Sequence, residues 1–227
     1  MGRDNSPKIR QGRKLERKQG NRENHDRILI VSEGRKTEPL YFQDIRAFYR
    51  LHSANVQVYY SKLGTAPIQV VKYAQQLFTK GDMHIGIRPK SFEQVYAVFD
   101  RDDHCSYFDA LRLAKSLDGK IKNDNKQSVV FKSISSVPCF ELWLLLHYED
   151  VSAPLTRYEV MARLKKYFPE YEKSKSGVFQ ITCQYLPLAI ERANRLIDLS
   201  KTHHDTVSQH PRTEINILVN VLKKLHL

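Results

Sequence analysis

Acidic residues follow two apolar segments of the chain, at positions where they could bind a metal ion together. Glu33 comes just after the aliphatic run Ile28–Val31, and Asp100 and Asp102 come at the end of a second apolar run. If both runs are strands of one parallel sheet, these acids meet at its carboxyl edge, where open α/β sheets bind ligands. Crowded carboxylates repel one another, and a divalent cation relieves that repulsion. Because oxygen ligands select hard ions, the pattern predicts a Mg²⁺ or Mn²⁺ site.

Glu141 is a further candidate ligand, because it lies inside the apolar segment 138–146 (PCFELWLLL). An unpaired charge is expensive to bury, so this carboxylate must have a partner. We count it with the metal ligands. Two alternatives stay open: contact with the helix dipole in a first turn after Pro138, or a salt bridge to Arg or Lys.

The aspartates could also have an ordinary structural role. Asp is favoured at helix starts, so Asp102 or Asp103 could only cap the next helix by accepting backbone hydrogen bonds. Asp-x-Asp alone is a weak motif. Its joint placement with Glu33 after two strands of one predicted parallel sheet is what favours a functional site made by Glu33, Asp100 and Asp102.

Basic residues accompany these acids in the sequence. Arg35 and Lys36 follow the first strand, Arg101 lies between the aspartates, and His104 follows them. In a site for phosphoryl transfer such groups bind the phosphate; otherwise they only neutralise the carboxylates. The segment SEGRKT lacks the paired glycines of a phosphate-binding Walker loop, so the chain is not expected to bind ATP itself.

Periodicity predicts an α/β fold with a four-stranded, largely parallel sheet flanked by helices. Four short apolar runs alternate with three segments of helical pattern. The expected strands are 28–31, 56–60, 94–99 and 128–134, and the expected helices are 37–51, 66–79 and 106–117. Thr37 is expected to cap the first helix, and Ser106 with Asp109 to form a capping box for the third.

Beyond this α/β core (28–137), the pattern is helical through residues 138–227. Helices are expected at 140–148, 157–168, 186–200 and 213–225. The polar segment 171–177 (YEKSKSG) between them is expected to be an exposed loop. The last helix carries an apolar stripe that fits packing on the core or on a second copy, so the oligomeric state stays open.

The charge of the chain predicts an anionic partner, above all nucleic acid. Its 227 residues include 37 Lys and Arg against 25 Asp and Glu, a net charge of +12. Residues 1–27 hold nine of the basic and four of the acidic residues with no aliphatic pattern, which predicts a flexible basic arm that is either solubilising or phosphate-binding. No apolar run reaches the roughly 18 residues of a membrane span. Three scattered cysteines without a CxxC pair argue against disulfides and zinc, and favour the cytoplasm.

Five segments of the chain, in the same order, resemble the RloB / AbiLii family. They are ILIVSEGRKTEPL (28–40), VFDRDDH (98–104), VPCFELWLL (137–145), YEKSKSGVF (171–179) and AIERANRL (189–196). The family is associated with restriction-modification loci and abortive-infection phage defence, beside an ABC- or AAA-type ATPase. The resemblance implies a TOPRIM-like core, in which Glu33, Asp100 and Asp102 carry the chemistry and Glu141 completes a two-metal site.

The resemblance therefore implies a Mg²⁺-dependent endonuclease acting in phage defence on RNA such as tRNA, or on DNA. Arg35, Lys36, Arg101 and His104 would contact its phosphates. A catalytically silent nucleic-acid-binding or regulatory subunit of the same ATPase complex is the alternative. Fold analogy alone does not decide between them.

Overall fold

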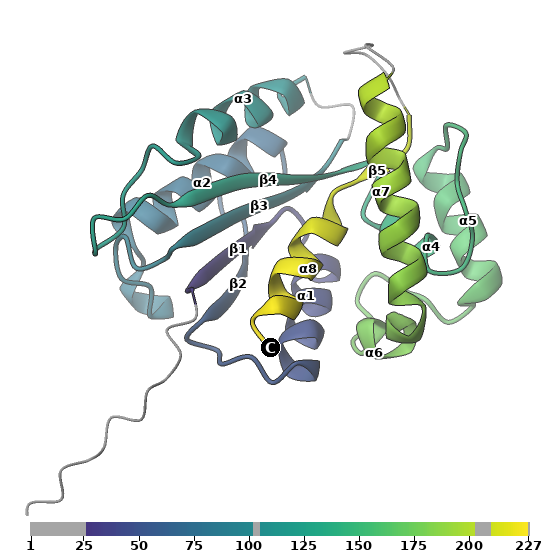
Figure 1. Cartoon of the computed structure of the whole chain (residues 1–227), viewed down its shortest axis with the longest axis horizontal. Coiled ribbons are helices and arrows are strands. Elements are labelled where there is room, and N and C mark those ends of the chain that lie inside the picture. Colours follow the sequence, from purple (N-terminus) through teal and green to yellow (C-terminus); the bar gives the residue numbers. More distant parts are fainter. Residues whose placement is uncertain (1–25, 102–104, 203–209, 227) are drawn as a thin grey trace, which may run out of the picture.

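The computed structural model describes residues 26–101, 105–202 and 210–226 (Figure 1). The strands are β1 (Ile28–Ser32), β2 (Val56–Tyr60), β3 (Gln94–Asp100), β4 (Val130–Val137) and β5 (Arg212–Thr213). The α-helices are α1 (Thr37–Phe48), α2 (Pro67–Lys80), α3 (Tyr107–Leu117), α4 (Glu141–Leu145), α5 (Arg157–Tyr167), α6 (Val178–Thr182), α7 (Leu186–Thr202) and α8 (Ile215–Lys224). Two 3₁₀ turns, η1 (Met83–Ile85) and η2 (Cys183–Tyr185), complete the set.

The strands form one sheet in the order β2-β1-β3-β4-β5. Strands β1 to β4 are parallel, and β5 pairs antiparallel with the end of β4. The chain passes from β1 to β2 on one side and then returns to β3 on the other side of β1. The carboxyl ends of β1 and β3 are therefore the point where the strand order reverses, which is where ligands bind in sheets of this kind.

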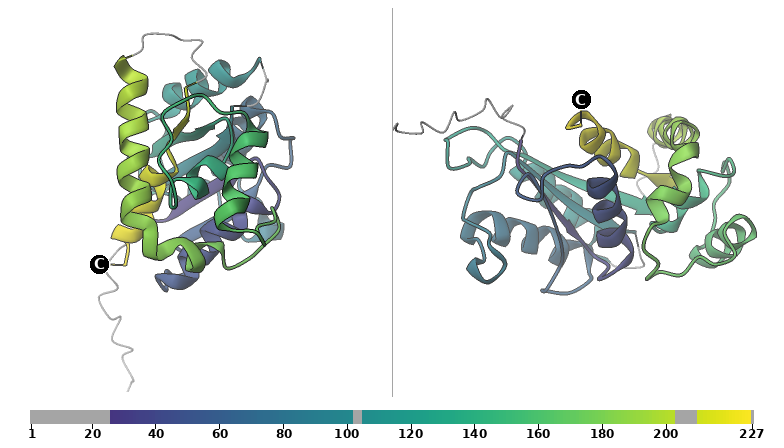
Figure 2. Two further views of the ribbon diagram at one scale, coloured as in Figure 1. Left: turned by 90° about the vertical axis from the view of Figure 1, so that its right-hand side faces the viewer. Right: turned by 90° about the horizontal axis from the view of Figure 1, so that it is seen from below.

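Both faces of the sheet are covered, which explains the uninterrupted aliphatic run of β1. Ile28 and Ile30 face the core under α1 and α8, whereas Leu29 and Val31 face the core under α2 and α3. Figure 2 shows α2 and α8 on opposite sides of the sheet. A strand buried on both faces reads as a continuous apolar run rather than as an alternating one.

Helices α4 to α7 lie beyond the carboxyl ends of the strands (Figure 1). Phe140, Leu142 and Trp143 belong to the same core as β1. The indole Nε1 of Trp143 donates a 2.7 Å hydrogen bond to the hydroxyl of Tyr41 in α1. This region thus packs directly on the α/β core and forms one side of the carboxyl edge. No helix in the described ranges is long and apolar enough to cross a membrane.

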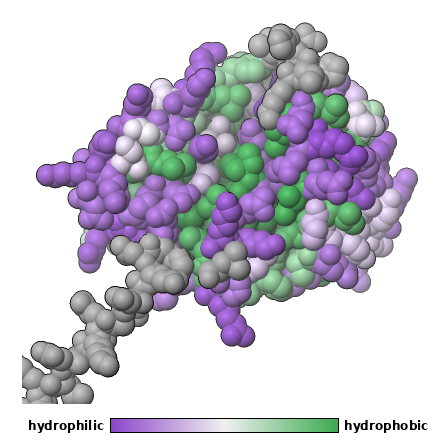
Figure 3. All heavy atoms as spheres, in the orientation of Figure 1, coloured by the Kyte–Doolittle hydropathy of each residue, from purple (hydrophilic) through white to green (hydrophobic). Residues whose placement is uncertain are grey.

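The surface is mainly hydrophilic around a more apolar centre on the face shown in Figure 3. Ile217 of α8 is one apolar side chain left exposed, at 41%. Leu218, Val219 and Leu222 of the same helix are fully buried, and Val221 is partly buried against the same core. The expected stripe of the last helix therefore packs within the chain.

The α/β class is confirmed, but the count of four strands is wrong. The fifth strand, β5, occupies Arg212 and Thr213, where a helix was expected to begin, and α8 starts only at Ile215. A strand of two residues has no periodicity to detect, and its pairing with β4 joins segments more than 70 residues apart. Strand β4 also runs to Val137 rather than ending at 134, and α6 was not expected.

The expected cap of the first helix is wrong, and Ser106 takes its expected position before α3 but forms no capping box. Thr37 is the first residue of α1 rather than its cap, and its hydroxyl donates to the carbonyl of Lys173 at 2.7 Å. Ser106 precedes α3 without a capping hydrogen bond, and Asp109 pairs with Arg112 instead. In both places a tertiary or local ion contact replaces the cap.

Candidate active site

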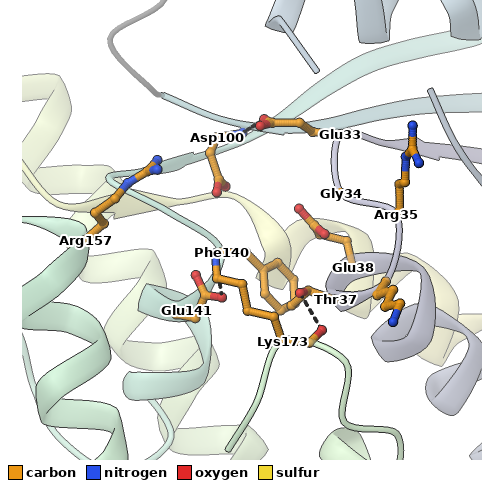
Figure 4. Close-up of a pocket in the computed structure, with 11 residues that line it drawn as sticks. Glu33, Gly34, Arg35, Thr37, Glu38, Asp100, Phe140, Glu141, Arg157 and Lys173 are labelled. Atoms are coloured by element: carbon orange, nitrogen blue, oxygen red, sulfur yellow. Dashed lines mark hydrogen bonds and ion pairs between the residues drawn. The ribbon is translucent and has the colours of Figure 1, made fainter. Parts of the chain in front are cut away.

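A pocket of about 310 Å³ lies at the reversal point of the sheet (Figure 4). It is bounded by the β1–α1 connection, the end of β3, the start of α4 and the segment 171–177. Its lining residues are Glu33, Gly34, Arg35, Lys36, Thr37, Glu38, Asp100, Phe140, Glu141, Arg157 and Lys173. Acidic and basic side chains thus share one concave site.

Glu33 and Asp100 meet as their positions after neighbouring strands predict. The backbone amide of Glu33 donates to Val98 at 2.9 Å, which extends the pairing of β1 with β3 by one residue. The Glu33 carboxylate then accepts the amide of Asp100 at 3.0 Å. This acid therefore also fixes the end of β3.

The Asp100 side chain points into the pocket (Figure 4). Burial raises its pKa well above the ordinary value, and the carboxylates of Glu38, Glu33 and Glu141 raise it further. A backbone hydrogen bond with Phe140 opposes the rise. The net rise shows that a negative charge here is poorly compensated by the chain itself.

Glu38 is a fourth acid of the pocket that the sequence did not reveal. It lies in the first turn of α1, is only 5% exposed and points into the cavity (Figure 4). Burial raises its pKa to about 7, with further increases from Glu33 and Glu141 and a decrease from Lys173. In the sequence it looks like an acid placed to suit the helix dipole, which hides its second role.

Gly34 makes room for Glu38. A Cβ atom at position 34 would collide with a carboxylate oxygen of Glu38. The glycine of the SEG segment is therefore needed for close approach of this side chain.

Glu141 has the partners that its burial requires. It is the first residue of α4 and 2% exposed, and its Oε1 accepts the Tyr171 hydroxyl at 3.2 Å. The same oxygen lies 3.4 Å from the ammonium of Lys173. The salt-bridge alternative is thus correct, and Glu141 still lines the pocket.

The segment 171–177 is not simply the exposed loop that its polarity predicts. Tyr171 is 1% exposed, and Thr37 binds the Lys173 carbonyl. Tyr171 is buried because it reaches a carboxylate 30 residues away in the sequence. Local composition carries no sign of that contact.

The predicted basic residues divide into two groups. Arg35 and Lys36 line the pocket, together with Arg157 and Lys173, which the sequence did not single out. Arg101 does not line it; its guanidinium lies 5.4 Å from the centroids of the Tyr107 and Phe108 rings. Predicted residues Asp102 and His104, and also Asp103, lie outside the described residues.

The described side chains do not include three ligands close enough together for one metal ion. Within residues 26–101, 105–202 and 210–226, no three His, Cys, Asp or Glu side chains are grouped closely enough to hold one ion. The four acids of the pocket approach it from three directions: the end of β1 and β3, the start of α1 and the start of α4.

Comparison with protein families places most of the chain in a known family. A family model described as RloB-like protein matches residues 28–222. The match begins at the first residue of β1 and ends within α8, so it includes every residue of the pocket. No curated protein and no solved structure matches the chain.

Proposed function

The chain belongs to the RloB-like family, and from its pocket we propose that it is a divalent-metal-dependent endonuclease. One observation carries the proposal: Glu33 and Asp100 meet where the strand order of a parallel sheet reverses, and two more carboxylates share their pocket. Metal-assisted hydrolysis of a phosphodiester uses such oxygen ligands for the metal, together with cations for the phosphate.

The donor chemistry of the pocket fits Mg²⁺ or Mn²⁺. Its acids offer oxygen ligands only, and the raised pKa values of Asp100 and Glu38 come partly from mutual repulsion. Glu33, Asp100 and Glu141 would hold two ions between them, with Asp102 as a further ligand expected from the sequence. A bound ion supplies an activated water and stabilises the leaving oxygen.

The remaining side chains of the pocket would bind the phosphate and accept a proton. Lys36 and Arg157 line the pocket with exposed side chains and would hold the scissile phosphate, whereas Arg35, whose side chain points away from the cavity, would contact the strand beside it. Glu38, with its pKa of about 7, can accept a proton from an attacking water near neutral pH. Lys173 would balance the charge of Glu141, from which it is 3.4 Å away.

The biological setting rests on the resemblance of the sequence. The nuclease would have a TOPRIM-like core and act in the cytoplasm as the toxic effector of an anti-phage system with an ATPase partner. RNA such as tRNA is the first substrate to try, and DNA the second.

The test is incubation of the purified chain with tRNA, single-stranded RNA and plasmid DNA in Mg²⁺, Mn²⁺ or EDTA. We expect cleavage that needs metal and that Asp100→Asn reduces at least a hundredfold. Asp109→Asn is the matched control, because Asp109 is exposed on α3 and pairs only locally with Arg112. A melting temperature of Asp100→Asn at or above that of the control variant would show that the loss is not one of folding.

Metal-dependent cleavage that survives in Asp100→Asn would assign the activity elsewhere. No cleavage of any substrate, with the ATPase also present, would contradict the proposal.

The contacts of Glu141 favour one other function, a non-catalytic subunit. Its carboxylate already has a hydroxyl and an ammonium as partners, as a structural acid would. If the protein is such a subunit, it would bind nucleic acid without cleaving it. Neither metal nor Asp100→Asn would then change its affinity for nucleic acid.

A further inference from the structure

Two exposed aromatic rings, each beside an arginine, stand at the carboxyl edge outside the pocket. Tyr60 ends β2 and is 38% exposed, with the Arg35 guanidinium 5.7 Å from its ring centroid. Phe108 lies in the first turn of α3 and is 39% exposed, with the Arg101 guanidinium at 5.4 Å. Each arginine comes from the end of a strand that also supplies an acid of the pocket.

The two pairs flank the acids along the sheet edge: Tyr60 ends β2, next to β1 with Glu33, and Arg101 directly follows Asp100 at the end of β3. Strand β1 with Glu33 lies between β2 and β3 in the sheet. The axes of β2 and β3 are therefore about 10 Å apart, at roughly 4.8 Å per strand. Figure 4 shows the Arg35 side chain pointing away from the cavity rather than toward the carboxylates. Neither arginine–aromatic pair closes the pocket; they extend the edge to either side of it.

These pairs have the features of a stacking surface for bases. Planar guanidinium groups and aromatic rings are the side chains on which unpaired bases stack. Tyr107 shows the contrasting structural case: it also contacts Arg101, but it is 3% exposed and its hydroxyl binds Ser135. Its neighbour Phe108 makes the same contact with Arg101 and leaves ring surface open to solvent.

We propose that the Tyr60–Arg35 and Phe108–Arg101 pairs are two base-stacking platforms, so that the pocket acts on single-stranded nucleic acid with unpaired bases on both sides of the cleaved bond. This inference rests on the proposed nuclease function and names its substrate class. A duplex does not fit, because its bases are stacked on one another and present no free face. Base stacking is common to RNA and DNA. The test therefore includes both a single-stranded RNA and a single-stranded DNA.

Binding in EDTA tests the platforms separately from cleavage. Fluorescence anisotropy would measure the full-length chain with a 12-nucleotide RNA, the same DNA sequence and a 12-base-pair RNA duplex. We expect single strands to bind at least tenfold more tightly than the duplex, and Tyr60→Ala or Phe108→Ala to weaken single-strand binding about tenfold each, as removal of one stacking ring does. Tyr60→Phe should bind like the parent. Phe48→Ala is the control, because Phe48 is 48% exposed at the far end of α1.

The outcomes separate the two proposals. Equal binding of duplex and single strands, or Ala variants that bind single strands like the parent, would overturn the platforms even if metal-dependent cleavage is present. Binding that needs Tyr60 and Phe108, together with no cleavage in Mg²⁺ or Mn²⁺ when the ATPase is present, would support the platforms and contradict the nuclease. The tighter of the two single strands identifies the substrate as RNA or DNA.

Discussion

Glu38 shows how burial gives one residue of the pocket a proton at neutral pH. Its pKa is about 7, above the ordinary 4.5, and the groups that face it are Glu33, Glu141, Asp100 and Lys173. The pKa of Glu38 is higher in the folded state than in the unfolded state. Its contribution to the free energy of unfolding is therefore fully present below about pH 4.5 and is lost as the pH rises through 7.

Glu38→Gln should therefore stabilise the metal-free chain at pH 8 and leave it unchanged at pH 4.5. The shift of the Glu38 pKa from 4.5 to about 7 corresponds to a gain on the order of 3 kcal/mol at roughly 1.36 kcal/mol per unit. Urea unfolding in EDTA at both pH values measures it, with exposed Glu172→Gln as the control. A parent and variant of equal stability at pH 8 would mean that Glu38 is not a poorly compensated buried acid.

Gly34 offers a way to move the Glu38 carboxylate without removing it. The backbone at Gly34 is not in the left-handed region, so an alanine is tolerated there except for its collision with the Glu38 carboxylate. Gly34→Ala should push this side chain out of the pocket and lower metal-dependent cleavage about tenfold or more.

The control is the same substitution in a Glu38→Ala background, where the collision is absent. Gly34→Ala should then cost no further activity. If it costs as much as in the parent, Gly34 acts through the backbone and not through Glu38.

At the scale of single elements, α4 is a five-residue helix with every residue buried. His147 follows it and is 1% exposed; its Nδ1 lies 3.0 Å from the Trp143 carbonyl, and Nε2 has no partner in the described structure. Burial lowers the pKa of this imidazole to about 4. The neutral ring therefore stabilises the fold above pH 6.5, and this contribution is lost as the pH falls through 4.

His147→Phe should remove that acid sensitivity. The ring keeps its apolar contacts, and no buried imidazole has to take up a proton. Between pH 7.5 and 4.5 we expect the parent to lose about 2 to 3 kcal/mol more stability than the variant, from a depression of roughly 2.5 pKa units. Unfolding at both pH values measures this, and His84→Phe, at an exposed histidine, should follow the parent. A variant that loses stability like the parent would place the acid-sensitive group elsewhere.

The elements differ in how far the sequence predicts them. The runs at β1 and β3 are continuous and aliphatic because both sides of the sheet are covered, so their strands and the meeting of Glu33 with Asp100 follow from pattern and topology. Strand β5 and the buried Tyr171 do not, because each depends on a partner distant in the sequence. Arg157 and Lys173 join the pocket for the same reason, through the way α5 and the segment 171–177 pack.

At the scale of the whole molecule, four acids share one pocket while the chain as a whole is strongly basic. Net charge is +12, and the part from Ile28 onward holds 28 basic against 21 acidic residues. An excess of positive charge attracts a polyanion to the surface, whereas the acids of the pocket lie where a metal ion is proposed to bind. Affinity and catalysis should therefore depend on different residues.

Salt dependence tests that separation. Removing one cation that binds a phosphate should reduce the slope of log affinity against log salt by about 0.7 for a single strand. Replacing Lys14, Arg17 and Lys18 by Gln should lower the slope for single-stranded RNA by up to about 2 while leaving cleavage at saturating RNA unchanged. The matched control replaces Lys80, Lys115 and Lys120, exposed lysines at the ends of α2 and α3, and should keep the parental slope. An equal fall in both triple variants would mean that binding follows net charge alone, and an unchanged slope in the first would show that residues 14–18 do not contact the strand.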